Sequence, residues 1–198
     1  MTSTSTRIVA GIAALASAVV VSSCSTTEDR SAQASSTAFT SAEVAVHNAD
    51  DVMFAQMMIP HHQQALELSA LVPDRSTNPA VVKLAATISG EQQPEITAMK
   101  AQLVQWDVQP DPSSDHSGHG MAMQGMVDDA TMAKLQSLKG AEFDTLWLQS
   151  MIGHHQGAIE MANTEIAKGA SPDMIAMAKN IVTAQQAEID QMKQMLGG

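Results

Sequence analysis

An internal repeat constrains the fold of this chain more than any other feature. A shift of 93 residues superimposes 51–103 on 144–196 without a gap, and 19 of the 53 aligned positions are identical. A unit of this size cannot bury its apolar stripe alone, so the two copies should pack on each other. The identical pairs in the first half of the repeat are Asp51/Asp144, Gln56/Gln149, Met58/Met151, Ile59/Ile152, His61/His154, His62/His155, Gln63/Gln156, Ala65/Ala158 and Glu67/Glu160.

The first copy has the pattern of a helical hairpin. Residues spaced three or four apart on one face predict a helix over 43–72. Asn78 followed by Pro79 is typical of an N-cap with proline at the first helical position, which predicts a second helix over 79–106. Pro94 falls inside this helix and is expected to kink it without ending it.

The second copy predicts helices over 141–168 and 172–196, and a short helix over 128–138 precedes it. The two hairpins should therefore form an all-α four-helix bundle with a short connecting helix. Pseudo-twofold symmetry would then bring equivalent residues of the two copies together.

The N-terminal residues are typical of an export signal. Arg7 is the only charge before an apolar run over 8–21, and Cys24 follows in Val-Ser-Ser-Cys, as in a bacterial lipobox. The run has about 14 residues where a membrane span needs about 20, so a transmembrane anchor is the weaker interpretation. We expect a lipoprotein signal peptide over 1–23 and lipidation of Cys24.

Three further segments follow. Residues 24–42 are poor in large apolar groups and should form a disordered tether. Residues 43–198 should form a single helical-bundle domain, with repeats over 43–106 and 141–198 and a linker over 107–127 rich in His and Met.

Composition excludes several kinds of site. Cys24 is the only cysteine, so a disulfide framework and a thiolate metal cage are both excluded, and a metal would have to use His, Met or carboxylate. Removal of 1–23 takes away Arg7 and no acid, so the net charge moves from −11 to −12. This charge disfavours nucleic-acid binding.

The two His-His motifs are the candidate metal site. Met58 precedes His61 by three residues and His62 by four, so the thioether and one or both imidazoles share a helix face. Adjacent histidines diverge by about 100 degrees, so one should point inward while its neighbour flanks the site or meets the second helix. The sequence leaves open which one does which. The candidate ligands are Met58, His61, His62, Met151, His154 and His155.

This donor set favours copper, because imidazole suits several transition metals and thioether selects Cu(I). Other transition metals stay open. Glu95 and Glu188, at matching points of the second helices, could orient the imidazole N–H groups. The alternative is a hydrogen-bonded polar core layer that only fixes the register of the bundle. Core packing is the preferred interpretation for the other helical methionines, namely Met57, Met161, Met174, Met177, Met192 and Met195.

The linker carries a second candidate metal site. Short His-rich tracts are associated with metal binding, and such a segment could capture copper and pass it inward. A solvated linker is the plain alternative. The residues concerned are His116, His119, Met121, Met123 and Met126.

Enzymatic motifs are absent from the sequence. A ferritin-type di-iron centre requires Glu-x-x-His pairs, and this spacing does not occur. There is no Gly-x-Ser-x-Gly elbow and no phosphate-binding glycine loop. We therefore expect a protein without catalytic activity, and a redox enzyme that uses bound copper is the less favoured alternative.

The segments MMIPHHQQALELS at 57–69 and FDTLWLQSMIGHHQGAIEMA at 143–162 resemble domain-of-unknown-function family 305, and the resemblance covers about 45–196. It implies a ferritin-like helical bundle of exported bacterial proteins, some of them linked to copper binding and copper tolerance. By motif position it implies the same six His and Met ligands. One departure is Gly157 opposite Gln64, which leaves the second copy without one side chain.

These observations together predict an exported, lipid-anchored, extracytoplasmic protein that buffers or sequesters copper. Its expected partners are the metal ion and, through the lipid, the membrane. The alternative is a structural or interaction module of the cell envelope.

Overall fold

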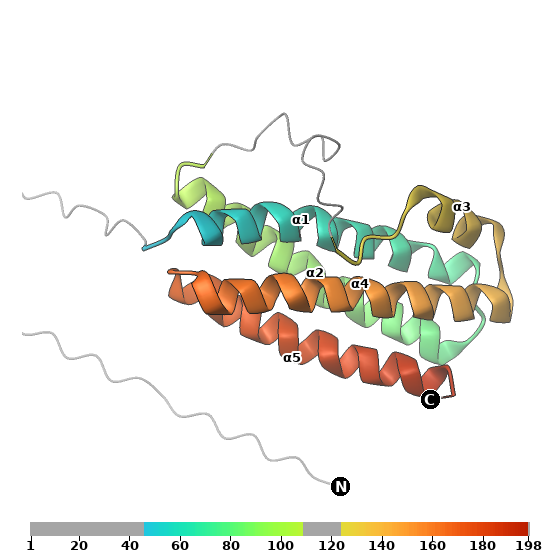
Figure 1. Cartoon of the computed structure of the whole chain (residues 1–198). Coiled ribbons are helices and arrows are strands. Elements are labelled where there is room, and N and C mark those ends of the chain that lie inside the picture. Colours follow the sequence, from blue (N-terminus) through green and yellow to red (C-terminus); the bar gives the residue numbers. More distant parts are fainter. Residues whose placement is uncertain (1–45, 109–123, 198) are drawn as a thin grey trace, which may run out of the picture. The chain divides into compact units, whose positions relative to one another are not determined.

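The structure is a computed structural model that describes residues 46–108 and 124–197, and every regular element in these residues is helical (Figure 1). Cys24, the predicted signal peptide and the predicted tether lie outside the described residues. The elements are α1 (Ala49–Ala70), the short 3-10 helix η1 (Val72–Asp74), α2 (Pro79–Gln105), α3 (Asp129–Ser137), α4 (Gly140–Lys168) and α5 (Pro172–Met195).

The four long helices form a bundle in which α1 packs on α2 and on α4, α4 packs on α5, and α2 contacts α5. Helices α1 and α4 are antiparallel. Asp51 near the start of α1 accepts hydrogen bonds from the backbone that follows α4, whereas Leu68 near the end of α1 accepts one from Trp147 near the start of α4. The predicted all-α bundle of two hairpins with a short connecting helix is confirmed.

Side-chain caps set the helix starts. The side chain of Asn48 accepts hydrogen bonds from the backbone N–H groups of Asp50 and Asp51, and that of Asp51 accepts one from Asn48. This capping box begins α1 at Ala49, so the predicted helix start at 43 was wrong, and residues 46–48 are not helical. Asn78 and Ser171 cap α2 and α5, each with proline at the first helical position.

Two prolines affect the helices differently. Pro73 lies in η1, and α1 ends at Ala70, so the first helix is shorter than the predicted range 43–72. Pro94 lies inside α2, which remains one helix from Pro79 to Gln105. An interior proline removes one backbone hydrogen bond, and the tertiary packing of this long helix outweighs that cost.

The apolar core consists of two separate clusters, which the repeat relates to each other. One cluster includes Trp147, Phe143 and Leu68, and the other includes Phe54, Met99 and Met174. Met174 and Met192 are fully buried, and Met161, Met177 and Met195 pack against the core while partly buried; Met57 is also partly buried. A layer of buried polar side chains, described below, lies at the middle of α1 and α4.

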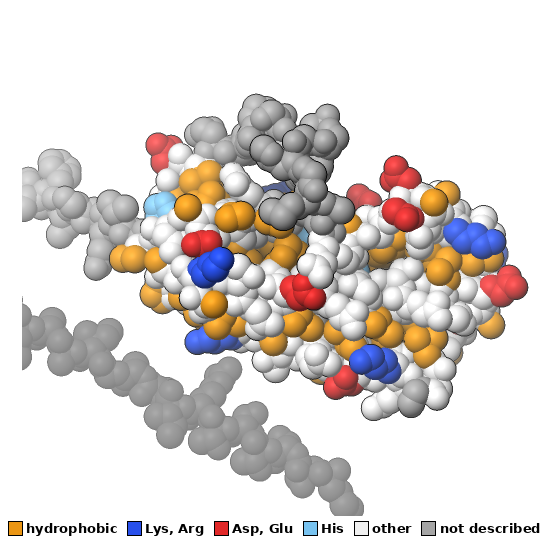
Figure 2. All heavy atoms as spheres, viewed as in Figure 1, with side chains coloured by type: hydrophobic (Ala, Val, Ile, Leu, Met, Phe, Trp, Pro, Cys, Tyr) orange, Lys and Arg blue, Asp and Glu red, His pale blue; other side chains and the backbone are white. Residues whose placement is uncertain are grey.

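On the face in Figure 2, acidic and basic side chains are scattered singly among uncharged ones. None of the helices in the described ranges has the length and apolar character that a membrane crossing requires.

Candidate metal centre

Four imidazoles are buried at the middle of the bundle. His61 and His62 come from α1, His154 and His155 come from α4, and all four are 0% exposed. The rings of His61 and His154 contact each other across the interface of the two hairpins, with centroids 3.7 Å apart and planes 38° apart. The pseudo-twofold axis therefore passes between these two rings.

The second histidine of each pair faces the other helix of its own hairpin. His62 Nε2 lies 2.7 Å from Glu95 Oε2, and His155 Nε2 lies 2.7 Å from Glu188 Oε2. A carboxylate accepts, so Nε2 donates in both rings, and Nδ1 has no hydrogen-bond partner among the described residues. The structure thus places Glu95 and Glu188 where a carboxylate would orient a ligating imidazole.

Burial keeps the inner pair of imidazoles neutral. Burial lowers the pKa of His61 to about 3, and the neighbouring His62 and His155 lower it as well. The hydrogen bond with Gln124 raises this pKa but does not offset the burial. The pKa of His154 lies well below its usual value, again because of burial and then the charge of His61. A neutral imidazole is the form that binds a metal ion, so neither ring has to lose a proton first.

The two candidate thioethers are buried, but they do not meet. Met58 and Met151 are both 0% exposed, and they belong to different core clusters. Because α1 and α4 are antiparallel, the two side chains lie about one turn to either side of the contact between His61 and His154. That both thioethers bind the same ion as the imidazoles stays a prediction.

The donor chemistry fits a soft or borderline metal ion. Five ring nitrogens are buried without a hydrogen-bond partner among the described residues: Nδ1 of His61, His62 and His155, and both nitrogens of His154. In the same residues, no three His, Cys, Asp or Glu side chains are placed to hold an ion between them. The inner rings contact each other, so an ion between His61 and His154 requires at least one ring to move.

The polar layer extends toward α2 and α5. Gln92 and Gln185 are equivalent in the repeat, and each is nearly fully buried with side-chain atoms that have no partner among the described residues. Burial, followed by the charges of Glu188 and Glu95, raises the pKa of Glu91. Gln92 and Gln185 lie outside the predicted site, although their identity in the repeat is a signal that could have revealed them.

A segment over 124–127 crosses α1 and α4 at the His61/His154 contact, and we call it the strap. His61 Nε2 lies 3.3 Å from the carbonyl oxygen of Gln124, and the side chain of Gln64 makes two hydrogen bonds with the backbone of Val127. Met126 belongs to the strap and is partly buried. The other residues of the second candidate metal site, His116, His119, Met121 and Met123, lie outside the described residues.

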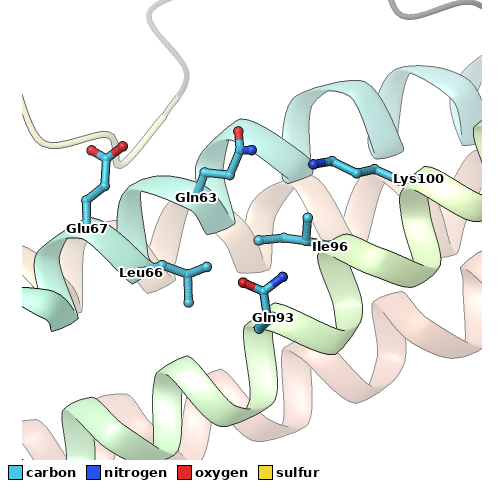
Figure 3. A pocket seen from close by; sticks show the side chains of 6 residues that line it. All are labelled: Gln63, Leu66, Glu67, Gln93, Ile96 and Lys100. Carbon is cyan, nitrogen blue, oxygen red and sulfur yellow. The ribbon is translucent and has the colours of Figure 1, made fainter.

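A shallow groove of about 420 Å³ lies between α1 and α2 (Figure 3). None of the candidate ligands lines it, so it is separate from the metal centre. Its lining residues are Gln63, Leu66, Glu67, Gln93, Ile96 and Lys100.

The fold and sequence are shared with solved structures. A presumed secreted protein from Streptomyces coelicolor has 34% identity and a TM-score of 0.69, over 75% of this chain and 92% of that one. A fragment from Deinococcus radiodurans has 35% identity and a TM-score of 0.67, over 76% and 97%. The protein CopM in its Cu(II)-bound form has 35% identity and a TM-score of 0.63, over 73% and 94%. CopM has also been solved with Cu(I) and with silver.

None of the curated proteins compared with this chain matches it. The model of the family described as a domain of unknown function, DUF305, matches residues 51–196. The match covers both hairpins and both His-His motifs. This chain therefore belongs to the DUF305 family.

Proposed function

We propose that this protein is an exported, lipid-anchored protein that binds copper and buffers or sequesters it outside the cytoplasm. The observation that carries the proposal is the layer of four fully buried imidazoles between α1 and α4, whose ring nitrogens include five without a partner in residues 46–108 and 124–197. A buried polar atom without a partner costs about 1–3 kcal/mol, so a metal ion that used these nitrogens would relieve a cost already present in the fold.

The choice of copper rests on the donors and on the likeness to CopM. Met58 and Met151 flank the imidazoles on either side, and a thioether prefers Cu(I) over harder ions. CopM, solved with Cu(I), Cu(II) and silver, is 31–35% identical to this chain. The proposed activity is binding and not turnover.

Competition with a colorimetric Cu(I) chelator would test the proposal. We expect the purified protein to withdraw Cu(I) from the chelator, and His61→Ala with His154→Ala to weaken the affinity at least about 100-fold, because both inner imidazoles are lost. The linker should be silenced in both proteins by His116→Ser, His119→Ser, Met121→Leu and Met123→Leu, so that only the buried site is measured.

Gln63→Ala is the matched control, since Gln63 is exposed on α1 next to the site. Equal Cu(I) affinity in the double variant and in this control would contradict the proposal. The His layer would then be a structural layer that fixes the bundle. The two His–Glu pairs and the ring contact support this structural alternative, because they hold the layer together without an ion.

The lipid anchor predicts a separate result. Expressed with its N-terminal segment in a bacterium that processes lipoproteins, the protein should fractionate with membranes, and Cys24→Ser should release it, because the acylated cysteine is lost. The mass of the N-terminal peptide checks the modification directly. A Cys24→Ser protein that stays with the membrane would contradict lipidation at this residue.

A further inference from the structure

The strap over 124–127 is fixed to α1 by one side chain. Gln64 Nε2 donates to the carbonyl of Val127, and the N–H of Val127 donates to Gln64 Oε1, both at 2.8 Å. A primary amide that pairs with both groups of one backbone residue holds that residue in position and orientation. Figure 1 shows the segment that precedes α3 lying over α1 and reaching the seam between α1 and α4.

The strap contacts α4 through two glycines. A Cβ added at Gly157 would lie 1.8 Å from the carbonyl oxygen of Gln124, and one added at Gly125 would lie 2.6 Å from the carbonyl oxygen of Gly153. Gly125 also has φ of +86°, which L side chains rarely adopt. Backbone therefore packs directly on backbone at this crossing, and no side chain fits at either position.

Gln64 and Gly157 are equivalent positions of the repeat. The two residues at this position have different roles. On α1, the long amide of Gln64 binds the strap. On α4, the absence of a side chain at Gly157 leaves room for the strap backbone. The difference between Gln64 and Gly157 therefore allows one strap to contact both helices of a pseudo-symmetric pair.

The strap makes the inner histidines unequal. The carbonyl of Gln124 can only accept, so His61 Nε2 carries the proton and His61 Nδ1 presents its lone pair. His62 and His155 also donate from Nε2, each to its glutamate. Neither ring nitrogen of His154 is paired with a side chain among the described residues. Three imidazoles are therefore held by a hydrogen bond before any ion binds, whereas His154 is held by packing against His61.

We propose that the strap positions His61 as a metal ligand, with Gln64 and Gly157 as the positioning residues that hold it. This inference rests on the copper binding proposed above. The strap fixes the tautomer of His61 and covers the α1–α4 side of the layer. His61 Nδ1 is then oriented before a copper ion arrives, His154 completes the site, and the ion leaves slowly because the strap must move first.

Two variants disturb the strap in different ways, and each has a matched control. Gln64→Ala removes the clamp, and Gly157→Ala removes the space under Gln124. Gln63→Ala changes the exposed neighbour of Gln64, and Gly153→Ala adds a methyl group one turn from Gly157 where no atom of the described residues lies within 4 Å. Circular dichroism shows whether each variant keeps its helices.

The first readout is the protonation state of the ring nitrogens in the metal-free protein, measured by heteronuclear NMR at one pH. We expect His61 to be the Nε2–H tautomer in the parent protein and in both controls, and a mixture of tautomers in Gln64→Ala and Gly157→Ala. The second readout is the rate at which loaded protein gives Cu(I) to a chelator. It should rise about 10-fold in the two strap variants only.

An unchanged His61 tautomer in both strap variants would overturn the inference, and so would an unchanged release rate. If Gly157→Ala does not fold, Gln64→Ala decides both readouts. A parent protein that binds no Cu(I) would overturn the proposed function and the ligand role of His61, whereas the tautomer measurement would still show whether the strap orients this ring. The two failures are therefore distinguishable.

Discussion

Replacement of Trp147 by alanine is expected to lower the free energy of unfolding by about 3–5 kcal/mol, the range for a fully buried large aromatic residue. Trp147 is 0% exposed and is the largest buried side chain of its core cluster. Its indole N–H also donates to the carbonyl of Leu68, 2.9 Å away on α1. The substitution therefore leaves a cavity and removes a hydrogen bond between the two hairpins. Urea unfolding followed by far-ultraviolet circular dichroism measures the change.

Two further variants separate these effects. Trp147→Phe keeps most of the ring and loses the N–H group, so it should cost only about 1–2 kcal/mol, particularly since the Leu68 carbonyl also accepts a bond from Leu71. Val104→Ala changes a side chain that is 77% exposed and should stay within about 0.5 kcal/mol of the parent. If Trp147→Ala cost no more than Val104→Ala, the packing of the hairpins at this end would not be the one described.

The stability of the protein is expected to fall as the pH rises from about 4.5 to about 8, by about 2–5 kcal/mol, because of Glu165. Glu165 is 1% exposed. Burial, followed by the neighbouring carboxylates of Asp51 and Asp50, raises its pKa to about 8. The folded protein thus keeps a proton on Glu165 that the unfolded chain releases at about pH 4.5.

The sign follows from this difference in proton binding. Because the folded pKa is raised, the stabilisation is fully present below about pH 4.5 and is lost as the pH rises through about 8, where Glu165 ionises beside an anionic neighbour. Burial alone would raise the pKa of Asp51, but hydrogen bonds from the backbone of Ser171, Asn48 and Ala170, together with the neighbouring Glu165, lower it. Asp51 therefore stays ionised, and Glu165 carries the proton.

Glu165→Gln tests this assignment, because an amide has the size and shape of the protonated acid but cannot ionise. The variant should be more stable than the parent near pH 8 and similar to it near pH 5, in denaturant unfolding curves at a series of pH values. Glu160→Gln, exposed on the same helix, should reproduce the pH dependence of the parent. A Glu165→Gln protein with the same pH dependence as the parent would show that another group is responsible.

Local patterns were sufficient to predict the hairpins. The N-cap and proline pairs at Asn78 and Ser171 mark helix starts that the structure confirms, because capping depends on residues adjacent in sequence. The start of α1 was predicted too early, since apolar periodicity extends beyond the capping residue Asn48. The Asp51–Glu165 interaction had no signal in the repeat, because Val72 occupies the position equivalent to Glu165.

The sequence by itself determined that this chain is a pair of helical hairpins with a His-His motif at the same point of each, because a gap-free repeat and helical periodicity follow from residue order alone. Only the tertiary structure decided that His61 and His154 meet each other while His62 and His155 turn to Glu95 and Glu188. Adjacent residues on a helix diverge by about 100 degrees, so the packing of the neighbouring helices had to select between two orientations that the sequence leaves equal.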